Sequence, residues 1–251
     1  MTADGLYVYA VVRSGQPLPK GAAGVDDPPA RVRSVRQGEV AAVVSAVPAV
    51  LRARRRDLLA HQALLMLLAE RGPVLPMRFG TVAPDERTLR DQLSQREARH
   101  LLTLERVADC VEVNVKIFPA QDALARLVED DPKVRRLRDA ARRRPGYEAS
   151  LRLGQSIALA LDDRAREAGR RAVRALGPLA REAAAGPEVQ GCVLNTSFLV
   201  GRDDSDAFRA EADRLASADR ERMQARVSEP LPCYSFVGPQ DAPARTAGVG
   251  G

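Results

Sequence analysis

Tryptophan is absent from this 251-residue sequence, aromatic residues make up only 4% of it, and cysteine occurs three times. Cys110, Cys192 and Cys233 are odd in number, far apart and without C-x-x-C spacing, which argues against a disulfide framework and against a zinc site of paired cysteines. No run of about 18 consecutive apolar residues occurs, so we expect no membrane-spanning helix. The N-terminus lacks a basic region followed by an apolar core, so we expect no signal peptide and a cytoplasmic location.

The sequence motifs of several enzyme classes are also missing. G-x-x-x-x-G-K-[ST], G-x-G-x-x-G, H-E-x-x-H and G-x-S-x-G do not occur, so a P-loop, a dinucleotide-binding turn, a zincin helix and a nucleophile elbow lack their sequence basis. The two histidines, His61 and His100, lie on or beside the apolar stripes of their expected helices, and we interpret both as core residues. We therefore expect no catalytic residue, no metal site and no cofactor.

Lysine is rare, occurring only at Lys20, Lys116 and Lys133, whereas arginine is abundant and the formal net charge is +6. Arginine clusters at residues 52–56 and 142–144 favour a nucleic-acid-binding surface. Acidic residues are interspersed with the arginines, as in E-R-T-L-R-D, so we interpret most charges as solvated helix faces. A basic nucleic-acid-binding regulatory protein is kept as the alternative function.

The first expected strand is L-Y-V-Y-A-V-V at residues 6–12. It carries Tyr7 and Tyr9 on one face and aliphatic residues on the other, so both faces need cover and the strand is expected to be central. Two tyrosines on one strand face are also a feature of RNA-binding RRM domains, but the second RRM signature strand is missing. We therefore interpret Tyr7 and Tyr9 as core residues.

The segment V-L-P-M-R-F-G-T-V, residues 74–82, is an apolar run with one arginine at its centre. Strand alternation puts Arg78 on the same face as Pro76 and Gly80, among apolar neighbours, with Leu75, Met77 and Phe79 on the opposite face. A buried guanidinium needs acceptors, so we expect an internal partner for Arg78. Contact with another molecule, or anion binding in a transferase, is the alternative. Pro76 and Gly80 indicate a bulge, an edge or the end of the strand.

The remaining elements follow from apolar periodicity and turn residues. A hairpin is expected from strands at 31–35 and 40–47, and V-E-V-N-V-K-I at 111–117 is expected to bury one face and leave Glu112, Asn114 and Lys116 wet. A further strand is expected at 189–200 and a short one at 231–237. Helices are expected at residues 51–71, 84–108, 120–129, 132–144, 147–185 and 206–227.

The helix expected at 147–185 carries an unusual stripe of mostly small residues. Small residues at alternating spacings of about four and three allow close helix packing, within the fold or against a partner, and we favour packing within the fold. The members of this stripe are Tyr147, Leu151, Gly154, Ala158, Leu161, Ala165, Ala168, Ala172 and Leu176.

The order β-β-β-α-β-α-β, followed by a helix-rich part, predicts an α+β fold with two domains. We expect residues 6–118 to form an N-terminal ferredoxin-like (modified) domain whose sheet carries helices on one face. Residues 119–238 are expected to form a C-terminal helix-rich α+β domain, and residues 239–251 a flexible tail.

Six segments, in order along the chain, carry a resemblance to a known family. They are Y-V-Y-A-V-V from Tyr7, the leucine-rich helix with His61, V-L-P-M-R-F-G-T-V, V-E-V-N-V-K-I, F-L-V-G-R from Phe198 and Y-S-F-V from Tyr234. On these segments, from about residue 6 to 238, the chain resembles the gas vesicle protein family GvpL/GvpF. Members commonly end with a G-P-W-P-P-Y-S-F-like segment, whereas residues 229–236 read E-P-L-P-C-Y-S-F here, without the Trp and with Cys233 in place of a Pro.

The resemblance implies a non-enzymatic accessory or minor structural protein that supports gas vesicle assembly. The implied partners are the small hydrophobic shell protein and other accessory vesicle proteins, with no nucleic acid and no membrane span, and the implied location is the cytoplasm and the gas vesicle. A very apolar shell subunit would aggregate unless its exposed strands were covered, and a sheet edge or helix groove can cover them. The family-motif or interaction candidates are Tyr7, Tyr9, His61, Leu75, Pro76, Arg78, Phe79, Gly80, Tyr234 and Phe236.

Overall fold

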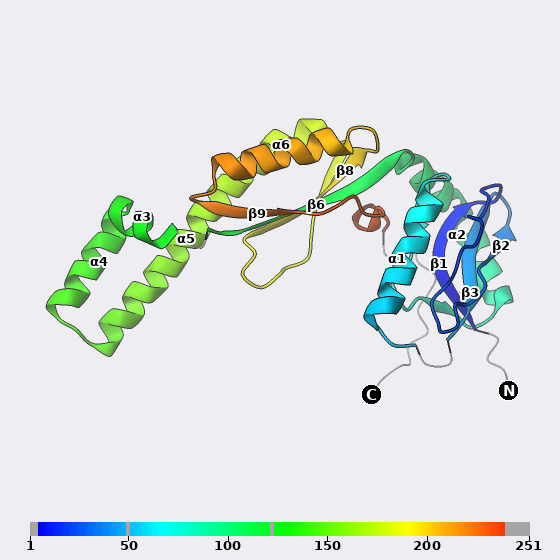
Figure 1. The fold of residues 1–251 in the computed structure, drawn as a ribbon, viewed down its shortest axis with the longest axis horizontal. Helices are drawn as coiled ribbons and strands as arrows, with labels where there is room; N and C mark the ends of the chain where they lie inside the picture. Colours follow the sequence, from blue (N-terminus) through cyan, green and yellow to red (C-terminus); the bar gives the residue numbers. More distant parts are fainter. Residues whose placement is uncertain (1–4, 49–50, 121–122, 239–251) are drawn as a thin grey trace. The chain divides into compact units, whose positions relative to one another are not determined.

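The computed structural model describes residues 5–48, 51–120 and 123–238. Its contacts divide the chain into two compact units, which are described separately. The first unit comprises the residues up to Glu112 together with those from Pro230 onward, and the second comprises Val113–Glu229. Both units combine helices with antiparallel strand pairs (Figure 1), so the α+β class expected from the sequence is confirmed.

The first unit is built around β1 (Leu6–Arg13), which is the central strand that its two apolar faces predicted. β3 (Val40–Ala46) pairs with β1 on one side, and β4 (Val74–Pro76) and β5 (Val82–Ala83) pair with it on the other. β2 (Arg33–Gln37) completes the sheet by pairing with β3 as the expected hairpin. Gly38 takes a φ of 57° in the tight turn between them, a conformation that glycine adopts at little cost.

Two helices cover this sheet, one on each face. α1 (Arg55–Ala69) packs Leu64, Leu65 and Leu68 into the same buried core as Tyr7 and Tyr9. α2 (Glu86–Arg106) lies on the other face, where its leucines and Val11 of β1 line one small cavity. The α+β class holds, but the expected placement of the helices on one face is wrong for this sheet. Because β1 is apolar on both faces, each face needs its own helix.

The second sheet has the strand order β7-β8-β6-β9. Its strands are β7 (Glu182–Ala185), β8 (Leu194–Gly201), β6 (Cys110–Pro119) and β9 (Met223–Val227). The sequence analysis placed the V-E-V-N-V-K-I strand in the N-terminal domain, whereas β6 lies between β8 and β9 in this second sheet. Alternation along a strand predicts which face is buried, but it does not identify the neighbouring strands.

α5 (Tyr147–Leu176) and α6 (Ser205–Ala218) pack against this sheet and against each other. Phe208 of α6 contacts Phe198 of β8, with ring centroids 5.1 Å apart. α5 approaches the sheet closely at Gly169, where an added Cβ would lie 2.8 Å from Cδ1 of Leu194 and 3.1 Å from Ile117. A glycine at this position therefore lets the helix backbone sit directly on the strands.

The small-residue stripe of α5 has two different halves. Ala165, Ala168, Ala172 and Leu176 are buried, which confirms packing within the fold for the C-terminal half. Tyr147, Leu151, Gly154 and Ala158 are exposed, so that expectation is wrong for the N-terminal half. The remaining helices, α3 (Ala123–Asp130) and α4 (Pro132–Arg143), pack against each other and against α5.

Two strands occupy ranges that the sequence analysis assigned to helices. β7 lies at the end of the range 147–185 and β9 at the end of the range 206–227. Alanine favours helices strongly, so E-A-A-A continues a helical pattern, but Gly177 and Pro178 end α5 in a 3₁₀ turn and pairing with β8 holds the alanines extended. The strand expected at 231–237 is also wrong, because only Leu231 forms a bridge and Tyr234–Phe236 is a 3₁₀ turn.

The contacts of residues 230–238 lie with the first unit, whereas the sequence analysis placed these residues in the second domain. The division between the units also falls after Glu112 and not after residue 118. The compactness of the two units does not show that each folds on its own, so the domain boundaries expected from the sequence stay a prediction. The expected tail, 239–251, and residues 121–122 of the helix expected at 120–129 lie outside the described residues. Within the described ranges, no helix is long and apolar enough to cross a membrane.

Candidate interaction site

Four aromatic residues predicted from the family motifs gather on one side of β1. Tyr7 and Tyr9, two residues apart on the strand, have ring centroids 4.7 Å apart. His61 of α1 lies 5.8 Å from Tyr7 and 5.5 Å from Tyr9, and Phe79 lies 5.8 Å from His61 and 5.9 Å from Tyr7. The tyrosines and the histidine are buried and Phe79 is half-buried. These residues form an aromatic core between β1, α1 and the chain after β4.

Hydrogen bonds fix the protonation pattern of this cluster. Nε2 of His61 lies 3.0 Å from the carbonyl oxygen of Met77, which only accepts, so Nε2 carries the proton. Nδ1 then accepts from the Tyr7 hydroxyl at 3.0 Å, and the same hydroxyl oxygen accepts from the Gly80 amide at 3.1 Å. This assignment follows from the hydrogen-bond partners. Tyr7 and His61 together hold both ends of the turn Met77–Gly80.

The second tyrosine is held separately. The Tyr9 hydroxyl lies 2.9 Å from Oγ of Ser45 on β3, and it accepts from the Val25 amide at 2.8 Å. Both partners come from segments that the sequence analysis did not connect with Tyr9. The alternation along β1 predicts that the Tyr9 ring is buried. The partners of the Tyr9 hydroxyl depend on which strand and loop lie beside β1, and alternation does not give these.

Burial keeps these side chains neutral. Burial raises the pKa of Tyr7. It also raises the pKa of Tyr9, where the hydrogen bonds with the Ser45 hydroxyl and the Val25 amide oppose the shift. Burial also lowers the pKa of His61, and the hydrogen bond to the Met77 carbonyl opposes this shift in part. His61 is therefore neutral near pH 7, with both ring nitrogens occupied. Its geometry serves a structural role, because neither nitrogen is available to a substrate.

Arg78 differs from the prediction. β4 ends at Pro76, the chain turns over Met77–Gly80 and extended structure resumes at Val82, so Arg78 sits at the turn and its side chain is exposed. Its carbonyl accepts from the amide of Thr81 at 3.2 Å and from the Thr81 hydroxyl at 2.7 Å. Among the described residues, no hydrogen bond or ion pair reaches the Arg78 guanidinium. The expected buried arginine with an internal acceptor is wrong, because the alternation stops where the strand stops.

The other turn residues support this geometry. Leu75, Pro76 and Met77 are buried, and Gly80 takes a φ of 84°, which favours glycine. The strand ending that Pro76 and Gly80 predicted is therefore confirmed. Of the motif L-P-x-R-F-G-T, the arginine is the side chain most open to another molecule.

The C-terminal motif Tyr234-Ser235-Phe236 is hydrogen-bonded to Glu112 of the first unit, a residue that the sequence analysis expected to be exposed. Glu112 is only 4% exposed, and its carboxylate accepts from the Ser235 amide and the Ser235 hydroxyl, both at 2.7 Å. Its main chain exchanges two hydrogen bonds with Leu231, at 2.8 and 2.9 Å. The expected wet position of Glu112 is therefore wrong, because residues 231–236 cover that face.

The aromatic side chains of this segment are partly or fully enclosed. Phe236 is buried, and Arg106 of α2 donates to its carbonyl oxygen. Tyr234 packs against the core that contains Tyr7 and Tyr9. Burial, with repulsion from Glu112 as the smaller cause, raises the pKa of Tyr234 to about 12. The C-terminal motif and the aromatic cluster therefore share one core.

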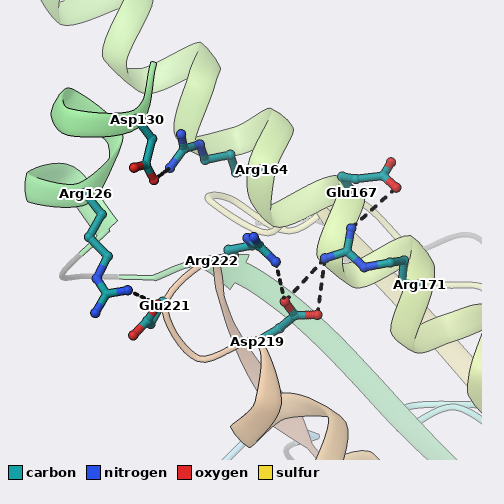
Figure 2. A network of polar contacts seen from close by, with 8 residues as sticks. All are labelled: Arg126, Asp130, Arg164, Glu167, Arg171, Asp219, Glu221 and Arg222. Carbon is teal, nitrogen blue, oxygen red and sulfur yellow. Dashed lines mark hydrogen bonds and ion pairs between the residues drawn. The ribbon is translucent and has the colours of Figure 1, made fainter. Parts of the chain in front are cut away.

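A separate polar network lies in the second unit (Figure 2). Asp219, at the end of α6, accepts from Arg171 of α5 at 3.3 Å and from Arg222 at 3.1 Å. Arg126 and Asp130 of α3 pair with Glu221 and Arg164, so α3 is tied to α5 and to the α6–β9 turn. Exposed ion pairs contribute about 0–1 kcal/mol each, so the network positions α3 more than it stabilises the unit.

A surface cavity of about 620 Å³ lies beside this network. It is lined in part by Arg126, Arg220, Glu221 and Gln224, and Arg126 pairs with Glu221. The described part of the chain holds no group of three or more His, Cys, Asp or Glu side chains placed to bind a metal ion.

Sequence reasoning placed Tyr7, Tyr9 and His61 in the core, and it missed their hydrogen-bond partners. Glu112, Ser45 and the Met77 carbonyl all act through contacts between segments far apart in the sequence, and no local pattern signals such contacts. Most of the candidate residues are structural, since they join β1, α1, the turn after β4 and the C-terminal segment. Arg78 alone among them is classed as exposed.

Comparison with known proteins gives a consistent result. The sequence profile of the family described as "Gas vesicle synthesis protein GvpL/GvpF" matches residues 5–238. "Gas vesicle protein F" of Streptomyces sp. (strain CB03234) is 41% identical over 235 residues, which cover 92% of this chain and 98% of that protein. "Gas vesicle protein L" of the same strain is 33% identical over 265 residues, which cover 95% of each chain.

The fold also matches a solved structure. The crystal structure of the gas vesicle protein GvpF from Anabaena sp. PCC7120 aligns with a TM-score of 0.75 at 24% identity, over 94% of this chain and 98% of that one. At this identity the likeness shows the fold. The match includes both the first and the second unit, since it spans nearly all of each chain.

Proposed function

Because this chain belongs to the gas vesicle synthesis protein GvpL/GvpF family, we propose that it is a non-enzymatic accessory or minor structural protein that supports gas vesicle assembly. The observation that carries the proposal is the extent of the match, which reaches from residue 5 to 238 and covers 98% of a 41% identical gas vesicle protein F. The family is one of gas vesicle proteins and not a known enzyme family.

The geometry of the aromatic cluster supports a role without catalysis. A general base needs a free nitrogen or oxygen within reach of a substrate. His61 is buried and uses both ring nitrogens within the fold, and burial raises the pKa values of Tyr7 and Tyr234. These side chains therefore serve the architecture of the first unit.

The proposed partner is the small hydrophobic shell protein of the vesicle, with other accessory vesicle proteins as further partners. The protein would meet the shell protein in the cytoplasm and at the gas vesicle. Arg78 is the motif residue that we propose as a contact, because it is exposed on a turn that Tyr7 and His61 hold rigidly. Because no described residue pairs with its guanidinium, Arg78 can bind a carboxylate or carbonyl groups of another chain.

The proposal is tested by expressing a gas vesicle gene set with and without this chain and counting vesicles by electron microscopy. We expect vesicles to be lost or malformed without the chain and restored when it is supplied. Normal vesicles in its absence would count against the assembly role.

Binding is tested separately by co-expressing the tagged protein with the shell protein and measuring the shell protein that co-purifies. We expect retention in buffers of low and high salt, because the shell protein is apolar. Salt-sensitive binding to generic DNA, with no retained shell protein, would favour a nucleic-acid-binding regulator instead.

A further inference from the structure

The net charge of this chain is concentrated in one helix of the second unit. Residues 132–144, which comprise α4 and the residue after it, contain seven of the 39 Lys and Arg residues and one of the 33 Asp and Glu residues. This segment alone therefore carries a formal charge of +6, which equals the net charge of the whole sequence. The rest of the sequence balances to zero, so the basic excess belongs to α4 and not to the surface in general.

Most basic side chains of α4 have no partner among the described residues. Arg138 pairs with Asp139, the one acidic residue of the helix, and Arg135 donates to the Glu129 carbonyl oxygen at 3.0 Å. The other basic side chains are exposed, and no hydrogen bond or ion pair within the described ranges reaches them. They are Lys133, Arg136, Arg142, Arg143 and Arg144. These exposed cations therefore lie within about three turns of helix.

The arginines of the neighbouring helix are arranged differently. On α5, Arg152 pairs with Glu148 and Arg166 pairs with Asp163, each within about one turn. Such pairs neutralise a solvated helix face, whereas like charges at the same spacings destabilise a helix. The concentrated charge of α4 therefore lowers the stability of this helix, and an acidic partner would offset that loss.

Two exposed apolar side chains lie near the end of the basic helix. α4 and α5 pack against each other and are joined by a short turn (Figure 1). Tyr147, three residues after Arg144, is 84% exposed, and Leu151, one helical turn further along α5, is 48% exposed. The surface at this end of the helix pair therefore combines several cations with apolar side chains.

This combination favours a protein partner over a membrane or a nucleic acid. α4 buries Val134 and half-buries Leu137, so its apolar side faces inward and only its charged side is left for a lipid surface. A phosphate backbone pairs with cations but offers no aliphatic surface to Leu151. Carboxylates bind guanidinium groups in bidentate geometry, and apolar side chains of the same protein segment can cover Leu151.

We propose that the exposed face of α4 and the adjoining start of α5 bind an acidic segment of a partner protein, in which Asp or Glu side chains alternate with apolar ones. The carboxylates pair with the exposed cations of α4, and the apolar side chains cover Tyr147 and Leu151. The inference goes beyond the proposed function, because it assigns a second contact surface whose partner is defined by its charge.

Charge removal tests this surface. The probe is a fluorescein-labelled synthetic peptide with the repeat E-E-L, and its binding to the full chain is measured by fluorescence anisotropy. The triple variant Arg136→Gln, Arg142→Gln, Arg143→Gln should bind this peptide at least about tenfold more weakly than the wild type. Binding by the wild type should weaken as salt is added.

The matched control removes the same charge from the first unit. Arg52, Arg54 and Arg55 are also exposed, so changing these three to glutamine lowers the net charge equally and should leave peptide binding unchanged. Circular dichroism checks that both triple variants are folded. Equal losses in the two triple variants would overturn the proposal, because net charge and not the α4 surface would then be recognised.

The apolar contact is tested with a second peptide, of repeat E-E-S. The wild type should bind the E-E-L peptide more tightly, and Leu151→Gln should weaken that peptide about threefold without changing the E-E-S peptide. Equal binding of the two peptides by the wild type would overturn the apolar part of the proposal.

The remaining outcomes concern other partners. The same anisotropy assay is run with a labelled DNA duplex, and co-sedimentation is measured with vesicles of phosphatidylcholine and phosphatidylserine. Tighter binding of either than of the E-E-L peptide, lost in the α4 triple variant, would assign the surface to that partner instead. No binding of the E-E-L peptide by the wild type would overturn the proposal. Because these probes contain no vesicle protein, such a failure leaves the proposed assembly role standing.

Discussion

The hydroxyl oxygen of Tyr7 lies 3.0 Å from Nδ1 of His61, a residue 54 positions further along the chain. The Tyr7 hydroxyl also receives the Gly80 amide, and His61 donates to the Met77 carbonyl. Two side chains therefore set the shape of the turn that presents Arg78. Through these contacts, the strand with Tyr7, the helix with His61 and the segment V-L-P-M-R-F-G-T-V form one structural unit.

Removing the Tyr7 hydroxyl should destabilise the protein. Tyr7→Phe leaves Nδ1 of His61 and the Gly80 amide without this partner in a buried site, which typically costs about 1–3 kcal/mol of unfolding free energy. Urea denaturation followed by circular dichroism measures the loss. Tyr234→Phe is the matched control, because the Tyr234 hydroxyl makes no hydrogen bond with the described residues, and its effect should stay within about 0.5 kcal/mol. Equal losses in the two variants would contradict the role given to Tyr7.

Stability should fall as the pH drops below the unfolded-state pKa of histidine. Burial lowers the pKa of His61 in the folded protein below the reference value of 6.5, so the unfolded chain takes up the proton first. The contribution is fully present above pH 6.5 and is lost as the pH falls, by at most about 1.4 kcal/mol per pH unit. Urea denaturation at pH 7.5 and pH 5.5 measures the change.

The control for this pH dependence is His61→Gln, whose amide can still donate to the Met77 carbonyl but does not titrate. The variant should be less stable at pH 7.5 and should lose less stability between pH 7.5 and 5.5. The same loss in both proteins would assign the pH dependence to other groups.

Glu112→Gln should loosen the C-terminal segment. The substitution replaces one acceptor oxygen with a donor, and the Ser235 amide and hydroxyl both donate to the present carboxylate. We expect a loss of about 1–3 kcal/mol in unfolding free energy and faster hydrogen exchange at residues 231–236. Ser235→Ala removes only one of the two bonds and should have the smaller effect. Unchanged exchange in Glu112→Gln would show that packing of Phe236 and Cys233 holds the segment.

Alanine should act differently at two glycines of α5. Gly154 is exposed with nothing near an added Cβ, so Gly154→Ala should stabilise the protein by about 0.5–1 kcal/mol through helix propensity. At Gly169 the added Cβ would press on Leu194 and Ile117, so the same change should be at least about 1 kcal/mol less favourable. Thermal denaturation compares the two, and equal gains would mean that the α5–sheet contact is easily widened.

Arg78→Ala should leave stability within about 0.5 kcal/mol of the wild type, because the side chain is exposed and unpaired among the described residues. If Arg78 is a contact, the variant should retain less shell protein in co-purification. Arg13→Ala, at an exposed arginine that ends β1, is the control and should bind normally. A large loss of stability in Arg78→Ala would restore the buried-arginine interpretation.

Local patterns were sufficient for a large part of the fold. β1 follows from an apolar pattern on both faces, the β2–β3 hairpin from two neighbouring strand patterns, and α2 from apolar periodicity. Asp85 caps α2 by accepting from the Thr88 amide. The burial of Tyr7, Tyr9 and His61 followed from the apolar faces of their strand and helix. Each of these depends on residues close together in the sequence or on a single element's period.

The predictions that failed depend on contacts across the sequence. The alternation in V-E-V-N-V-K-I predicts that Glu112 is exposed, but Glu112 is buried because residues 231–236 lie over it. The alanines of β7 favour a helix by their intrinsic propensity, but they are extended because β8 pairs with them. Arg78 looks buried only if the strand continues past Pro76. In each case tertiary pairing overrides a local preference.

The attachment of residues 230–238 to Glu112 has a consequence for biosynthesis. The first unit is assembled from both sides of the second, so its closing segment leaves the ribosome only after residues 113–229 have been made. Until then the face of Glu112 and part of the aromatic core stay uncovered. The first unit can therefore become whole only after all of the second unit has been synthesised.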